Sequence, residues 1–139
     1  RFPNNLESKS LYIESLIYLD KVDEAEELLK KYPQSYKNYS TKGKEIWKVR
    51  ERYLSAVLNM QKGNYEDAKE SFLLVIENYN LEFQWFKALS YLKIGQIYDL
   101  NNQRENAKKY YKLAINTRET TKAVKEAKEY LKAPFTIEK

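Results

Sequence analysis

Four carboxylates close together are the first group in this sequence that could do chemistry. They are Asp23, Glu24, Glu26 and Glu27. Neighbouring carboxylates can act as an acid and base pair or hold a cation, but acid catalysis near neutral pH requires burial that raises the pKa of one of them. These four occupy the polar positions of a helix-forming segment, in alternation with its apolar positions. We therefore interpret them as a solvated helix surface.

The run from Asp99 to Gln103 is similar to the opening of a calcium-binding loop. It lacks the central glycine, and Tyr110 stands where the bidentate glutamate should be, so we reject a calcium site. Neither of the glycine-rich patterns that cradle phosphate groups occurs in the chain.

The composition narrows the chemistry further. The 139 residues include no histidine and no cysteine, which excludes histidine general bases, protease triads, thiolate zinc sites and disulfides built from this chain alone. Only carboxylate, lysine or tyrosine chemistry remains. We expect no enzymatic activity, no cofactor and no metal site.

The elements that would position these residues are predicted to be helices. Three glycines and three prolines are too few for the many tight turns of an all-β fold, while 42% hydrophobic residues are enough to form a core. Three polar turns each lead into an alanine, and the alanines Ala25, Ala68 and Ala107 are 43 and 39 residues apart. Apolar residues recur with helical period before and after each turn, which predicts three helical hairpins. The expected helices span about 7–19, 22–32, 43–62, 65–79, 82–100, 104–117 and 121–132.

The third hairpin carries a recognisable pattern of small and aromatic residues. Its members are Tyr91, Ile94, Gly95, Tyr98, Ala107, Tyr111 and Ala114. This pattern resembles the tetratricopeptide repeat, whose unit of about 34 residues reads W-x2-L-G-x2-Y, A-x3-F, P. The middle hairpin keeps a divergent version with Gly63, Tyr65, Ala68 and Phe72, and the first keeps little beyond Ala25 and Leu29.

The resemblance implies an all-α, right-handed solenoid of helical hairpins in one domain over residues 1–139. The repeats would cover about 6–33, 43–80 and 82–117, and the helix at 121–132 would cap the array. The segment Pro3-Asn4-Asn5 is similar to the closing segment of a repeat. We therefore expect the C-terminal part of a longer array, with an uncovered N-terminal face through which the chain could self-associate.

The resemblance also implies a function, namely binding a peptide or partner protein on the concave surface formed by the first helix of each hairpin. Apolar burial would supply affinity, and Arg50, Lys93 and Gln96 would supply selectivity. The expected partner-binding residues are Arg50, Tyr53, Val57, Met60, Leu89, Leu92, Lys93 and Gln96. Some family members hold the C-terminal carboxylate of a partner with a clamp of lysine and asparagine side chains. Only Lys93 matches a position of that clamp here, so the C-terminal tail of a heat-shock chaperone is not the expected ligand.

Two alternatives remain open. The segment Lys31-Tyr32-Pro33-Gln34-Ser35 resembles the repeat ends of bacterial outer-membrane assembly proteins, which favours a structural spacer in an envelope or secretion protein. Residues 34–62 and 102–139 each carry a net charge of +5, which would favour binding to the phosphates of RNA. Acidic residues share the same helices, so nucleic acid is the less favoured partner. No apolar run approaches the roughly 20 residues of a membrane span, and nothing in the sequence indicates a compartment.

Overall fold

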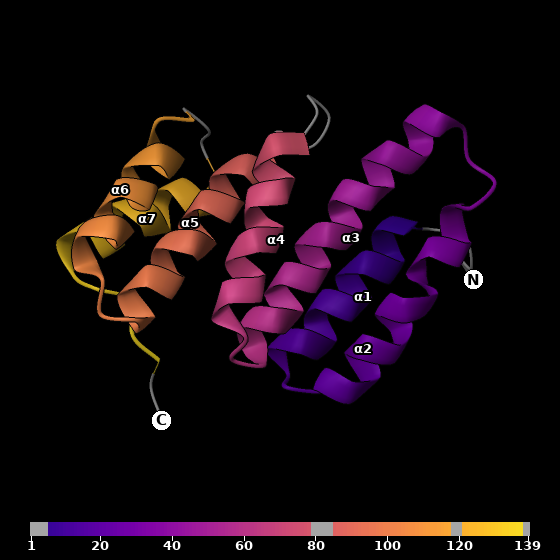
Figure 1. The fold of residues 1–139 in the computed structure, drawn as a ribbon, viewed down its shortest axis with the longest axis horizontal. Helices are drawn as coiled ribbons and strands as arrows, with labels where there is room; N and C mark the ends of the chain where they lie inside the picture. Colours follow the sequence, from indigo (N-terminus) through magenta and orange to yellow (C-terminus); the bar gives the residue numbers. More distant parts are fainter. Residues whose placement is uncertain (1–5, 79–84, 118–120, 138–139) are drawn as a thin grey trace. The chain divides into compact units, whose positions relative to one another are not determined.

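A computed structural model of the chain describes residues 6–78, 85–117 and 121–137. Within these ranges the chain is helical and contains no β-strand, which confirms the all-α prediction (Figure 1). The helices are α1 (Leu6–Tyr18), α2 (Val22–Lys31), the 3-10 helix η1 (Tyr32–Tyr36), α3 (Thr41–Gln61), α4 (Tyr65–Asn78), α5 (Trp85–Leu100), α6 (Arg104–Ile115) and α7 (Lys122–Lys132). None of these helices, over the part of the chain that the structure describes, combines the length and apolar character needed to span a membrane.

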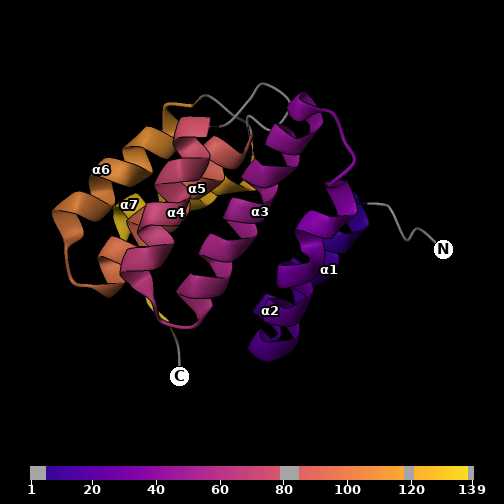
Figure 2. The ribbon, with the colours of Figure 1, turned by 45° about the vertical axis from the view of Figure 1, so that its right-hand side comes forward.

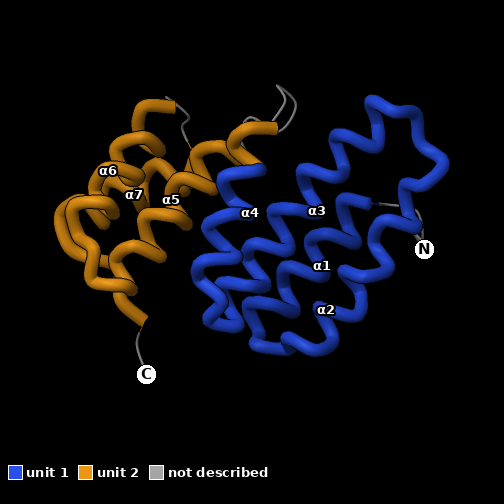
Figure 3. The backbone as a smooth tube through the Cα atoms, in the orientation of Figure 1, with its two compact units in different colours: residues 1–74 blue, residues 75–139 orange. Residues whose placement is uncertain are grey.

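The chain divides into two compact units, residues 1–74 and 75–139, which are called the N-terminal and C-terminal units below (Figure 3). In the N-terminal unit α1 packs against α2 and α3, and η1 contacts both α2 and α3. Figures 1 and 2 both show α3 and α4 as antiparallel neighbours. In the C-terminal unit α5 pairs with α6, and α7 packs against both. The succession of antiparallel helices confirms the predicted helical hairpins.

The segment between α2 and α3 differs from the prediction. The expected helices ended at about residue 32 and resumed at about residue 43, but η1 follows α2 directly and α3 begins at Thr41. The Ser40 hydroxyl accepts a hydrogen bond from the Gly43 amide at 3.1 Å and so caps α3, whose first residue, Thr41, lies two residues before the predicted start. Pro33 fits the first turn of η1 because its missing amide has no partner to lose there. The predicted end at 79 and start at 82 lie outside the described residues.

The three hairpin turns have the same backbone conformation. Asp20, Gly63 and Asn102 each adopt a left-handed conformation, with φ of 62°, 84° and 60°. In each turn the next amide reaches back to a carbonyl of the preceding helix at 2.8 Å, as in a Schellman motif. These hydrogen bonds run from Lys21 to Leu16, from Asn64 to Asn59 and from Gln103 to Tyr98. The equivalence of the three turns, aligned above on their alanines, is therefore confirmed.

We expect Gly63→Ala to lower the free energy of unfolding by about 1 kcal/mol, because a left-handed φ costs a residue with a Cβ atom roughly that much. Apart from Gly63 and its two chain neighbours, no atom lies within 4 Å of the position that the new Cβ would take, so the cost is that of the backbone alone. Urea denaturation followed by circular dichroism measures it. Gly63→Asn is the matched control and should cost less than half as much, since asparagine already occupies the equivalent position at Asn102. Equal costs for the two variants would contradict this explanation.

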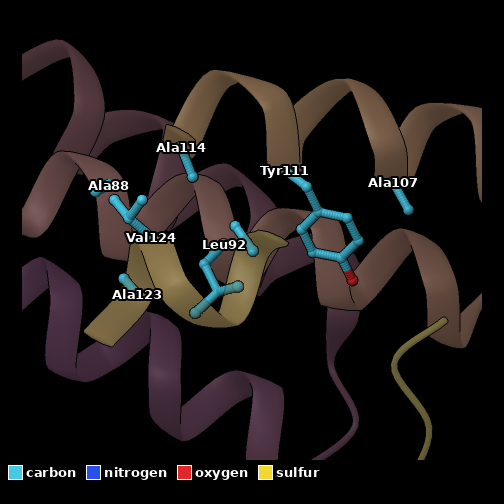
Figure 4. Packing of buried hydrophobic residues seen from close by; sticks show 8 residues of the cluster. Ala88, Leu92, Ala107, Tyr111, Ala114, Ala123 and Val124 are labelled. Carbon is cyan, nitrogen blue, oxygen red and sulfur yellow. The ribbon is translucent and has the colours of Figure 1, made fainter. Parts of the chain in front are cut away.

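Small residues let the helices of the C-terminal unit approach closely. The buried cluster, drawn in Figure 4, consists of Ala88, Leu92, Ala107, Tyr111, Ala114, Ala123, Val124 and Ala127. Four alanines on α6 and α7 contribute almost no side-chain volume, so Leu92, Tyr111 and Val124 fill the space between α5, α6 and α7.

Candidate partner-binding surface

The four expected partner-binding residues of the N-terminal unit lie on α3. Arg50, Tyr53 and Val57 are buried, and Met60 is half-buried. Their spacing of three and four residues places them on one side of the helix. That side is largely covered by other helices of the chain, so only Met60 exposes part of its side chain there.

Arg50 is held by a carboxylate from another helix. Its Nη1 and Nη2 atoms donate to Oε1 and Oε2 of Glu7 on α1, each at 3.1 Å. The Arg50 side chain is almost completely buried, while that of Glu7 is half exposed. A two-point pair of this kind fixes orientation as well as distance. The Arg50 guanidinium therefore holds α1 against α3, and its expected role in selectivity stays a prediction.

Tyr53 packs inside the N-terminal unit. Its ring meets that of Phe72 on α4 edge to face, with centroids 5.9 Å apart. Burial raises the pKa of the Tyr53 hydroxyl well above its usual value, and nearby Tyr18 and Glu14 add to the shift. Tyr53 is thus a neutral core side chain that joins α3 to α4.

The four expected residues of the C-terminal unit lie on α5. Leu92 belongs to the buried cluster described above, and Leu89 packs at its edge with part of its surface exposed. Gln96 is buried beside Tyr130 of α7. The pKa of Tyr130 is raised, chiefly by burial and next by the charge of Glu126, while its hydrogen bond with Gln96 acts in the opposite direction. Lys93 is partly exposed.

Of the eight residues, Met60, Leu89 and Lys93 therefore keep accessible surface, and the other five are enclosed by their own unit. Leu89 and Lys93 are one helical turn apart on α5, so they present an apolar side chain next to a cation. This pair is the best-placed contact surface among the expected residues of the C-terminal unit.

A buried polar centre at Asp99 was missed by the sequence reasoning. The side chain of Asp99 is 1% exposed, and its Oδ2 atom accepts hydrogen bonds from the Tyr111 hydroxyl at 2.6 Å and from the Phe135 amide at 3.0 Å. Arg104 Nη1 donates to both carboxylate oxygens, at 3.1 and 3.0 Å. The residue considered above for a calcium loop instead joins α5 to α6 and to the segment after α7.

The partners of Asp99 extend this connection. Arg104 Nη2 donates to the carbonyls of Tyr130 at 2.6 Å and Leu131 at 3.0 Å, which are among the last carbonyls of α7 and have no partner within the helix. The pKa of Tyr111 is raised, first by burial and then by its hydrogen bond to Asp99 and the charge of that carboxylate. Tyr111 therefore stays a neutral donor, and these contacts of the Asp99 centre all join parts of the C-terminal unit to one another.

Two segments of the chain match a known protein family. The family model described as tetratricopeptide repeat matches residues 52–80 and 88–121. The first match covers the second half of α3 together with α4, and the second covers α5 from residue 88 onward together with α6. No curated protein and no solved structure matches the chain significantly.

Proposed function

Because residues 52–80 and 88–121 place this chain in the tetratricopeptide repeat family, we propose that it is a non-catalytic module that binds a partner protein or peptide. Repeats of this family generally mediate protein–protein interactions. The observation that carries the proposal is that the two matches fall on the helices of two successive hairpins, α3–α4 and α5–α6.

The partner is expected to use the exposed part of the first helix in the hairpin α5–α6. Leu89 offers apolar surface at the edge of the core, and Lys93 offers a positive charge one turn further along α5. Leu92 and Gln96, which are buried, would hold this helix in place rather than touch the partner. In the N-terminal unit, Met60 is the corresponding accessible residue of α3.

Site-specific photo-crosslinking tests this proposal. A photoreactive amino acid at position 93 should crosslink the full chain to a recurring partner in cells of its source, whereas the same group at Lys125, an exposed lysine of α7, should not. With the partner then purified, Lys93→Glu should weaken binding about tenfold, as expected for one contact in the centre of an interface. Lys125→Glu is the matched control. Equal crosslinking at the two positions, or equal loss of affinity in the two variants, would overturn the assignment of this surface.

A further inference from the structure

A stripe of large apolar side chains lies exposed on the first hairpin. Leu11, Tyr12, Tyr18 and Leu19 have between 51% and 67% of their surface accessible. Their spacing places them along one side of α1 and its C-terminal end. Together they expose on the order of 400 Å² of mostly apolar surface, which is the size of patch that often marks an interaction site. These four residues are called the α1 stripe.

A pocket adjoins the α1 stripe. It lies between α1, α2 and η1, has a volume of about 250 Å³, and is lined by Ile13, Leu28 and Tyr32. Tyr12 belongs to both the α1 stripe and the pocket wall, so the two form one continuous surface. Pockets for whole small molecules usually measure about 300–1,000 Å³. This pocket is therefore better matched to a single large side chain of a protein.

The charge at the pocket has one sign. Among the described residues that line it, two are lysines, Lys9 and Lys31, and none is acidic. The Lys9 ammonium donates a hydrogen bond to the Ser35 hydroxyl at 2.9 Å, which keeps it at the pocket edge. Lys31 is exposed on α2. A side chain entering the pocket would therefore be favoured if carboxylates flanked it.

The length of the stripe favours a helical ligand. From Leu11 to Leu19 the helix axis rises roughly 12 Å, more than one side chain can cover. We propose that the α1 stripe and its pocket form a docking site for an acidic amphipathic helix of a partner protein, with one apolar side chain in the pocket and glutamates or aspartates near Lys9 and Lys31. Apolar anchors at i, i+4 and i+7 of such a helix match this surface.

The site can be tested with two synthetic helical peptides of roughly 18 residues, or five turns. Both carry the same leucine and phenylalanine face, and they differ only in having glutamate or lysine on the flanks. Fluorescence anisotropy with the full chain should show that the acidic peptide binds about tenfold more tightly than the basic one, and that Tyr12→Ser removes about tenfold of that affinity. Lys31→Glu should reduce or reverse the preference.

Leu73→Ser provides the matched control, because Leu73 is an apolar residue of α4 that is 42% exposed and lies outside the α1 stripe. It should leave acidic-peptide binding unchanged. Leu11→Ser is a second variant in case Tyr12→Ser changes the circular dichroism spectrum. Three results would overturn the proposal: equal binding of the two peptides, binding that neither stripe variant weakens, or sedimentation showing a dimer that Tyr12→Ser dissociates. The last would identify the surface as an interface between copies.

Discussion

Replacing Asp99 by alanine is expected to lower the free energy of unfolding of the C-terminal unit by about 3–5 kcal/mol, the usual cost of removing one partner from a buried ion pair. Asp99 accepts from Arg104, Tyr111 and the Phe135 amide in a site where its own side chain is 1% exposed. Without the carboxylate, the Tyr111 hydroxyl loses its acceptor, and water has little access to replace it.

The effect should extend beyond the immediate contacts. Arg104 also satisfies the last carbonyls of α7, so an arginine that has lost Asp99 would hold the end of α7 less firmly. Hydrogen exchange followed by mass spectrometry is the suitable measurement, because it reports on α5, α6 and α7 separately from the N-terminal unit. We expect faster exchange in all three helices and in residues 133–137.

Two controls separate the lost charge pair from a general effect of substitution. Asp99→Asn keeps the size of the side chain and one acceptor oxygen, so it should cost less than Asp99→Ala. Glu129→Ala removes an exposed carboxylate from α7 and should change stability by less than about 0.5 kcal/mol. If Asp99→Ala behaved like Glu129→Ala, the Asp99 centre would not be what holds α7 in place.

The sequence was sufficient to predict the helices and their turns. Helical period located the seven α-helices found among the described residues, and the alanine alignment identified three turns that the structure shows to be equivalent. These features are local, because a turn motif involves residues no more than six apart. The early start of α3 was also locally encoded, because serine is a favoured N-cap residue and the Ser40 hydroxyl accepts from the backbone amide three residues later, which the prediction overlooked.

The contacts between helices were not predictable in the same way. Periodicity shows which side of a helix is apolar, but it does not show which helix covers that side. Arg50 was expected to face a partner, and its carboxylate partner Glu7 lies 43 residues away in the sequence. Asp99 meets Phe135 from 36 residues away. Such pairs depend on how the hairpins pack, for which one sequence carries no direct signal.

Gly95→Ala is the second substitution with a large expected effect. The new Cβ would lie 2.5 Å from one carbon of the Tyr111 ring and 2.7 Å from another, well inside normal contact. The ring cannot move away easily, because its hydroxyl is held by Asp99 at 2.6 Å and its face packs against Tyr130. We expect a loss of about 1–3 kcal/mol from overpacking, even though alanine is favoured over glycine in a helix by roughly 1 kcal/mol.

A double-mutant cycle shows whether the Tyr111 ring is the cause. In a Tyr111→Leu background the ring is gone, so adding Gly95→Ala should cost less than about 0.5 kcal/mol and could stabilise α5 through helix propensity. Urea denaturation of the four proteins gives the coupling energy, and hydrogen exchange assigns it to the C-terminal unit. The same cost for Gly95→Ala in both backgrounds would mean that the close approach of α5 and α6 is not set by Tyr111. In that case the cost of Gly95→Ala would arise in the backbone of α5 itself and not from packing within the hairpin.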